Sequence, residues 1–214
     1  MAARSATDVE HLILFTRYPA PGQVKTRLIP ALGAEGAATV QRRMTEAAAA
    51  QAESLAATRR LRLEICYDGG DPAQVAQWLA PLAPSGRCRP QGDGDLGQRM
   101  QRAMELAFVE GARRVVLLGC DCPALSTAIM ARAFDDLRDH DLVLGPALDG
   151  GYYLLGLAAP QPSLFAEMAW GDEAVLARTM ARAAAASLRV SLLEALADVD
   201  RPEDLCHLGG YPHP

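Results

Sequence analysis

Short apolar runs alternate with longer segments of helical periodicity along this chain, and that alternation limits the fold more than any other feature. His11–Thr16 is a continuous apolar run that ends in a loop rich in proline and glycine, as expected for a buried first strand. The Ala-rich segment Glu35–Thr58 that follows has a composition that favours helix. Strands that alternate with helices predict an α/β fold, with a largely parallel central sheet and helices on both faces.

The remaining elements follow the same alternation. Further strands are predicted at Leu61–Tyr67, Val115–Gly119, Leu142–Gly145, Tyr152–Leu157 and Leu188–Leu193. Further helices are predicted at Ala73–Leu82, at Leu96–Glu110 with Leu96 facing the core, after a cap at Ser126, at Asp172–Ala186 and at Pro202–Leu208. No internal repeat, linker or change of composition divides the chain, so residues 1–214 are predicted to form one domain.

The composition argues against several classes of protein. The balance of 21 Lys+Arg against 26 Asp+Glu gives a net charge of −5, whereas nucleic-acid binding normally needs a basic excess. Met1–Val9 is polar, and no apolar stretch approaches the ~20 residues of a membrane helix. The five cysteines lack zinc-site spacing, which favours reduced thiols. We therefore expect a cytoplasmic protein that binds neither nucleic acid nor a membrane.

The segment Pro19–Leu28, directly after the first predicted strand, holds residues suited to a phosphate. Gly22 follows Pro21 and lets backbone N–H groups approach a ligand closely, while Lys25 and Arg27 can neutralise phosphate oxygens. The segment is not a P-loop, because that motif requires glycine immediately before the lysine. A solvated basic loop is the alternative interpretation.

Two acidic motifs suggest a cation site. Asp121 ends the most apolar predicted strand, and Asp200 precedes Arg201-Pro202 near the end of the sequence. Ligands of open α/β sheets bind at the carboxyl ends of strands, so residues distant in sequence can converge there. Mg²⁺ is commonly held by one or two carboxylates together with substrate phosphates and water. Asp121 and Asp200 are therefore candidates to share one ion; the alternative for each is a helix cap.

Gly145–Leu154 is the third segment of interest. Asp149, Gly150 and Gly151 form a loop with few side chains in the way of a ligand, and Tyr152 adds a flat ring with a hydroxyl tip. Asp-Gly between apolar runs also signals a hairpin turn, and both interpretations can hold together.

These motifs, taken in order, resemble a known family. GQVKTRL, LLGCDCP, GPALDGGYYLLGL and DVDRPEDL are similar to an uncharacterised bacterial family of the nucleotide-diphospho-sugar transferase superfamily. That superfamily has the Rossmann-like glycosyltransferase-A (GT-A) fold. Its members include the guanylyltransferases of molybdenum cofactor and phospholactate biosynthesis. The resemblance spans roughly residues 11–205.

The resemblance implies a role for each motif. Pro21, Gly22, Lys25 and Arg27 would hold the nucleotide and its phosphates, and Asp121 with Asp200 would bind Mg²⁺ or Mn²⁺. Asp149, Gly150, Gly151 and Tyr152 would line the acceptor or sugar pocket. Gly94 and Gly97 belong to a loop that would border the base. The candidate catalytic residues are Lys25, Arg27, Asp121 and Asp149.

The implied activity is transfer from a nucleoside triphosphate or a nucleotide-sugar to a small-molecule acceptor. Glycosyl and nucleotidyl transfer share this first set of residues, and the resemblance places the family nearer the glycosyltransferases. The chain departs from sugar-nucleotide pyrophosphorylases, because Phe15–Pro19 replaces their Gly-x-Gly start. A non-catalytic nucleotide-binding protein on the same fold is the alternative, and a homo-oligomer is left open.

Overall fold

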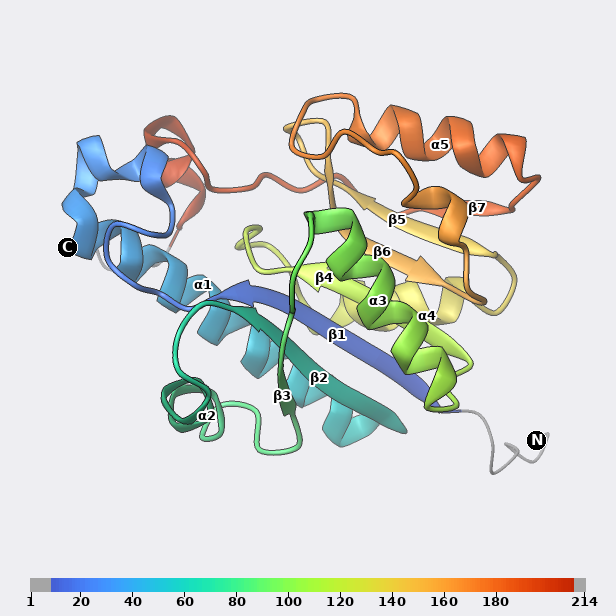
Figure 1. Ribbon diagram of the computed structural model, residues 1–214, viewed down its shortest axis with the longest axis horizontal. Helices are drawn as coiled ribbons and strands as arrows, with labels where there is room; N and C mark the ends of the chain where they lie inside the picture. The colour runs from blue at the N-terminus through green and yellow to red at the C-terminus, as the bar shows by residue number, and fades with distance from the viewer. Residues whose placement is uncertain (1–8, 210–214) are drawn as a thin grey trace.

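The apolar runs meet in one sheet (Figure 1). The computed structural model describes residues 9–209, and the strand order is β3-β2-β1-β4-β6-β5-β7. The strands are β1 (Glu10–Arg17), β2 (Leu61–Asp68), β3 (Arg87–Pro90), β4 (Arg114–Gly119), β5 (Leu142–Pro146), β6 (Tyr152–Leu157) and β7 (Val190–Leu192). β6 runs antiparallel to β4 and β5, and every other neighbouring pair is parallel. The predicted mostly parallel α/β architecture is confirmed.

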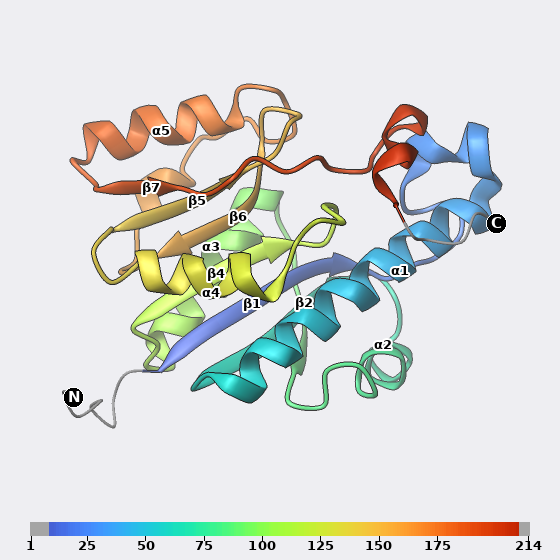
Figure 2. The same ribbon diagram turned by 180° about the vertical axis from the view of Figure 1, so that it is seen from behind.

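Helices cover both faces of this sheet. They are α1 (Ile29–Thr58), α2 (Pro72–Leu79), α3 (Leu96–Val109), α4 (Thr127–Asp136) and α5 (Val175–Ala185), with 3-10 helices η1 (Thr26–Leu28), η2 (Pro162–Leu164) and η3 (Pro202–His207). Successive side chains of a strand point to opposite faces. Leu12 and Leu14 therefore pack with α1 and α4, seen in front in Figure 2, while Ile13 and Phe15 pack with α3.

One strand was not predicted. β3 has the sequence RCRP, which carries no apolar alternation, and it lies at the edge of the sheet. Its Arg89 forms an ion pair at 2.8 Å with the buried Glu64 of β2. Charge pairing across the strands therefore holds β3 in place where apolar periodicity would normally be the signal.

The long helix begins earlier than predicted, at Ile29 instead of Glu35. Pro30 lies in its first turn, where the missing N–H is tolerated. Gly33 interrupts the helix with a φ of 70°, a left-handed value that glycine adopts readily. The kink re-aims the first turns of α1, which follow directly from the Lys25 loop.

Three further expectations need correction. Leu96 is 46% exposed, because it is the first residue of α3 and lies outside the packed face formed by Met100 and Met104. α5 begins at Val175, after a turn in which the Asp172 carboxylate accepts from the N–H of Ala174. The predicted strand over 188–193 is shorter, as β7.

The end of the described chain packs against its beginning. Val199 is fully buried in a small core with Leu28 of η1 and Met44 of α1, and Leu205 of η3 covers this core. Both views show η3 lying beside the start of α1 (Figures 1 and 2). Within residues 9–209, no helix combines the length and apolar character needed to cross a bilayer.

Candidate active site

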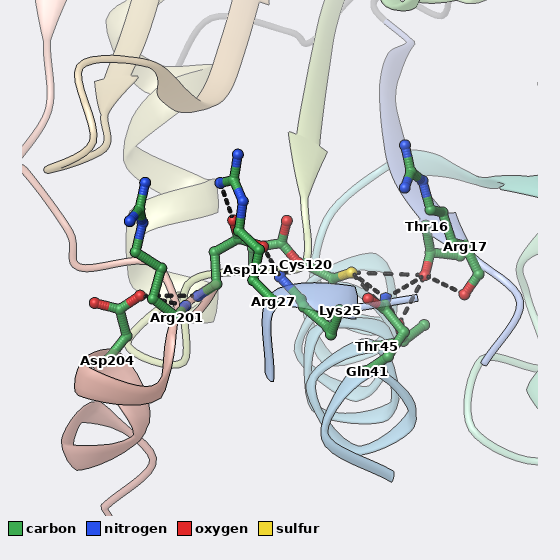
Figure 3. Close-up of polar contacts among 11 residues, drawn as sticks. Thr16, Arg17, Lys25, Arg27, Gln41, Thr45, Cys120, Asp121, Arg201 and Asp204 are labelled. Carbon is green, nitrogen blue, oxygen red and sulfur yellow. Dashed lines mark hydrogen bonds and ion pairs between the residues drawn. The ribbon is translucent and has the colours of Figure 1, made fainter. Parts of the chain in front are cut away.

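Three segments far apart in sequence converge at the carboxyl ends of the central strands. They are the loop after β1, the end of β4 and the segment before η3 (Figure 3). Because β1 and β4 are parallel neighbours, both end at the same edge of the sheet. The backbone N–H of Val199 donates to the carbonyl oxygen of Asp121 at 2.9 Å, which joins the last segment to the end of β4.

The Lys25 ammonium lies at the centre of this convergence. Its Nζ is 2.7 Å from Oδ1 of Asp121 and 3.8 Å from Oδ1 of Asp200. Only 5% of the Lys25 side chain is exposed, whereas that of Asp121 is 53% exposed. Burial alone would lower the pKa of Lys25, but the two carboxylates more than offset burial, so the pKa is raised and the ammonium stays charged.

Arg27 contacts the same acidic group from the solvent side. Its guanidinium donates to Oδ2 of Asp200 at 2.6 Å. Asp200 is not the cap of η3, because it is the Asp204 carboxylate that accepts from the N–H groups of Asp200 and Arg201. The capping interpretation of Asp200 is therefore wrong, and its carboxylate is directed to Lys25 and Arg27.

The loop conformation explains why the Lys25 side chain points inward. Gly22 has a φ of 78° and is exposed beside Pro21, and Lys25 itself has a φ of 46°. Positive φ is uncommon for residues other than glycine and costs free energy unless the surroundings favour it. The ion pair between the buried Lys25 ammonium and Asp121, together with the start of η1 at Thr26, stabilises this conformation.

A buried polar cluster lies directly behind Asp121. The Cys120 thiol is within 3.3 Å of the Gln41 amide and 3.4 Å of the Thr45 hydroxyl, and Thr45 contacts Thr16 at 2.7 Å (Figure 3). Sequence reasoning missed this cluster, although Gln41 and Thr45 are a polar i, i+4 pair on the buried face of an Ala-rich helix. The cluster links α1, β1 and β4 at the site.

Two more carboxylates lie near the ion pair. The pKa of Asp198 is raised, first by burial and then by the negative charge of Asp149, while Lys25 acts in the opposite direction. Asp149 also accepts from the N–H of Gly151 at 2.8 Å, in the turn between β5 and β6. That turn joins antiparallel strands, so the predicted hairpin is confirmed. Asp198 was not singled out from the sequence.

Three further predicted residues, Gly97, Gly150 and Tyr152, pack against the segment that contains Trp170 and Glu173. A Cβ at Gly97 would lie 2.2 Å from Nε1 of Trp170, and one at Gly150 would lie 2.1 Å from the carbonyl oxygen of Glu173. Both glycines therefore let the segment around Trp170 pack closely. The Tyr152 and Trp170 rings pack edge-on, with their centroids 6.4 Å apart.

Gly94 opens the turn before α3. Its φ is 103°, and its carbonyl oxygen accepts from the Arg99 side chain at 2.8 Å. Gly94 and Gly97 thus shape the amino end of α3. The predicted residues that the structure does bring together, through three ion pairs, are Lys25, Arg27, Asp121 and Asp200.

The donor set at the ion pair can be compared with the needs of a divalent cation. Among residues 9–209, no three His, Cys, Asp or Glu side chains are arranged as a metal centre. The carboxylates in direct contact with Lys25 are those of Asp121 and Asp200, and both are part-exposed. That set fits Mg²⁺ or Mn²⁺, since Mg²⁺ commonly retains water and takes its other ligands from substrate phosphates.

Comparison with solved structures defines the class of the protein. A proposed nucleotide-diphospho-sugar transferase from Desulfovibrio desulfuricans G20 is 36% identical, with a TM-score of 0.84 over 93% of this chain and 85% of that chain. CMP:2-keto-3-deoxy-manno-octonic acid synthetase, solved with CTP, shares the fold at 12% identity and a TM-score of 0.54, over 93% and 96% of the two chains. A Mycobacterium tuberculosis H37Rv protein solved with manganese does so at 17% identity and a TM-score of 0.52, over 94% and 98%. The chain therefore has the fold of nucleotide-diphospho-sugar transferases and nucleotidyltransferases.

Within that class, the chain belongs to the bacterial family DUF2064, described as an uncharacterized protein conserved in bacteria, whose model matches residues 43–172. The resemblance inferred from the four motifs is confirmed. Asp121 and Asp149 lie inside the matched range, and Lys25, Arg27 and Asp200 lie outside it. No curated protein matches the sequence.

Proposed function

We propose that this protein is a nucleotidyltransferase that depends on a divalent cation and takes a nucleoside triphosphate as donor. One observation carries the proposal: three ion pairs of 2.6–3.8 Å connect Lys25, Arg27, Asp121 and Asp200 at the carboxyl ends of the central strands. This edge is where open α/β sheets bind ligands. Basic groups that can grip phosphates and carboxylates that can hold a cation are the two requirements of phosphate transfer.

The reaction follows from these groups. An oxygen of the acceptor's phosphate attacks the α-phosphorus of the donor, and the bond to the bridging oxygen breaks, so pyrophosphate leaves. Lys25 and Arg27 stabilise the negative charge that accumulates on the leaving group. Asp121 and Asp200 would hold Mg²⁺ or Mn²⁺, which supplies further neutralisation of phosphate charge when bound. Under this proposal, the loop at Asp149–Tyr152 would contact the acceptor, and the turn at Gly94–Gly97 would border the base.

Charge favours a triphosphate over a nucleotide-sugar. A triphosphate carries more negative charge than the diphosphate of a nucleotide-sugar, and it matches a divalent cation together with both Lys25 and Arg27. Two of the structures that share this fold are described with CTP, namely the synthetase solved with CTP and an inositol-1-phosphate CTP transferase from T. maritima. The manganese complex of another supports the use of a divalent cation.

Glycosyl transfer is the second candidate, because the 36% identical relative is named as a nucleotide-diphospho-sugar transferase. Under this alternative, the same basic groups would stabilise a departing nucleoside diphosphate. A non-catalytic nucleotide-binding protein would hold the same nucleotides without turnover. The leaving group therefore distinguishes the three hypotheses.

Phosphorus NMR tests the proposal directly. The purified protein is incubated with Mg²⁺, each of the four common nucleoside triphosphates and a panel of sugar phosphates; a parallel series uses nucleotide-sugars with neutral sugar acceptors. We expect pyrophosphate and a new nucleotide-sugar signal with one triphosphate, and loss of both when EDTA removes the cation. Nucleoside diphosphate release in the second series would establish glycosyl transfer instead. Nucleotide binding without either product would favour the non-catalytic protein.

A further inference from the structure

Lys25 is chemically singular in this chain. It is the only lysine among the 21 Lys and Arg residues of the sequence, and all the others are arginines. A lysine ammonium is a compact point charge, whereas the arginine guanidinium is a broad planar fork. A compact charge is the form that fits between two carboxylate oxygens, and Lys25 lies in that position between Asp121 and Asp200.

We propose that the Lys25 ammonium is a built-in counter-cation that competes with the divalent cation for Asp121, so that cation and nucleotide bind cooperatively. This inference rests on the proposed function, in which Asp121 and Asp200 hold the ion. Lys25 is then a residue that sets the order and coupling of binding, in addition to contacting phosphate.

The competition follows from the contact itself. Oδ1 of Asp121 is 2.7 Å from Nζ of Lys25, which is a direct charge-assisted hydrogen bond. A divalent cation bound at that carboxylate repels the ammonium beside it, so Lys25 must give up the contact. Arg27 does not occupy the same position, because it approaches Asp200 from the solvent side through Oδ2 and is 60% exposed.

Displacement of Lys25 is costly when nothing replaces the carboxylate. Only 5% of its side chain is exposed, and a buried ammonium without an anionic partner is strongly disfavoured. A phosphate oxygen of a bound nucleotide supplies the missing partner. The divalent cation should therefore bind weakly alone and tightly with a nucleotide, and thermodynamic linkage requires the converse for the nucleotide.

The first test measures Mn²⁺ binding without nucleotide, from the free-ion signal in electron paramagnetic resonance. Lys25→Met keeps an unbranched side chain, one atom shorter than that of lysine, and removes its charge. We expect this variant to bind Mn²⁺ alone about tenfold more tightly than the wild type. Arg189→Met is the matched control, since it removes an equal charge from an exposed pair with Asp141 at another sheet edge and should leave Mn²⁺ affinity unchanged.

Equal or weaker Mn²⁺ binding by Lys25→Met would overturn the inference while leaving the proposed function in place, provided that Asp121→Asn still abolishes Mn²⁺ binding. If neither the wild type nor Lys25→Met binds Mn²⁺, or if Asp121→Asn leaves Mn²⁺ binding unchanged, the cation site of the proposed function fails as well. Far-ultraviolet circular dichroism checks that each variant is folded.

A second test needs no variant. Protein grown with lysine carrying ¹³C at Cε gives a side-chain NMR signal from Lys25 alone, because no other lysine exists in the chain. We expect Mg²⁺ at low concentration to leave this signal unchanged, and Mg²⁺ with the nucleoside triphosphate to move it. A signal that moves equally with Mg²⁺ alone, or that never moves while nucleotide and Mg²⁺ are both bound, would contradict the competition.

Discussion

The carbonyl oxygen of Asp121 accepts a hydrogen bond from the N–H of Val199 at 2.9 Å, and this bond ties the segment that carries Asp200 to the end of β4. Asp200 is the residue after Val199, so its position relative to Asp121 depends on the same anchor. The Val199 side chain is fully buried against Leu28 and Met44. The packing of an apolar side chain therefore helps to position the neighbouring Asp200, which pairs with Lys25 and Arg27.

Val199→Ala should weaken the site more than it weakens the fold as a whole. Loss of two buried methyl groups leaves a small cavity and should lower the free energy of unfolding by about 1–3 kcal/mol, measured with urea. Mn²⁺ affinity should fall as well, because the segment that carries Asp200 is no longer held firmly. An unchanged Mn²⁺ affinity would show that the backbone hydrogen bond alone positions Asp200.

Asp121→Asn should abolish turnover and leave the protein folded. The amide preserves the shape at the end of β4 but loses the negative charge that a cation and the Lys25 ammonium both require. Since even groups that only support a metal ligand change activity by about 10- to 100-fold, the direct loss should exceed about 100-fold. Product formation by phosphorus NMR and thermal unfolding are the two measurements. Wild-type activity at saturating Mg²⁺ would remove Asp121 from the site.

His11 should make the protein less stable in mild acid. It is 3% exposed, its Nε2 is 3.7 Å from Glu64, and neither ring nitrogen hydrogen-bonds to a protein group within residues 9–209. Burial lowers its pKa below the ordinary 6.5, and the Glu64 carboxylate only partly opposes that effect. As pH falls below about 6.5, His11 binds a proton in the unfolded chain more readily than in the folded one, so the free energy of unfolding decreases.

His11→Leu should remove this part of the pH dependence between about pH 5 and 7, in urea titrations repeated at several pH values. His207→Asn is the matched control, because His207 is exposed at the end of η3. If the two variants show the same pH profile, the buried imidazole is not the titrating group.

Gly97→Ala should disturb the aromatic cluster beside the site. The new Cβ would lie 2.2 Å from Nε1 of Trp170, so the ring must leave its stacked position on Phe165. We expect a loss of about 1–3 kcal/mol in the free energy of unfolding and a shifted tryptophan fluorescence maximum. Gly209→Ala is the control, since open space surrounds its Cβ position. Normal fluorescence from Gly97→Ala would mean that the segment around Trp170 adapts without cost.

The elements with strong apolar periodicity were predictable, and those held by charge were not. The run at 115–119 reads as a buried strand because each residue is apolar, and β4 lies there. Arg87 and Arg89 carry no such signal, and only Glu64 and Glu110 on other elements explain why β3 forms. Arg59 shows the same limit: nothing in its sequence surroundings predicts a buried side chain, yet its guanidinium is bound to Glu10 and largely buried.

The edge of the sheet that carries the site was predictable from sequence, and the contacts within it were not. Lys25 and Asp121 each follow a strand, so parallel pairing alone places them at the same edge. The inward direction of Lys25 depends on its positive φ, which no propensity assigns to lysine. The position of Asp200 depends on how Val199 packs, which is a tertiary contact.

The ion pair has a consequence for how the protein is made. Arg27 and Asp200 are 173 positions apart, so they meet only after nearly all of the described chain has left the ribosome. Lys25 emerges early, without Asp121 or Asp200 to neutralise it, and the closing contact spans the longest loop that the site contains. Until the segment that carries Asp200 packs beside β4, a growing polypeptide with its sheet already formed would have Lys25 and Asp121 in place but would lack the second carboxylate of the proposed cation site.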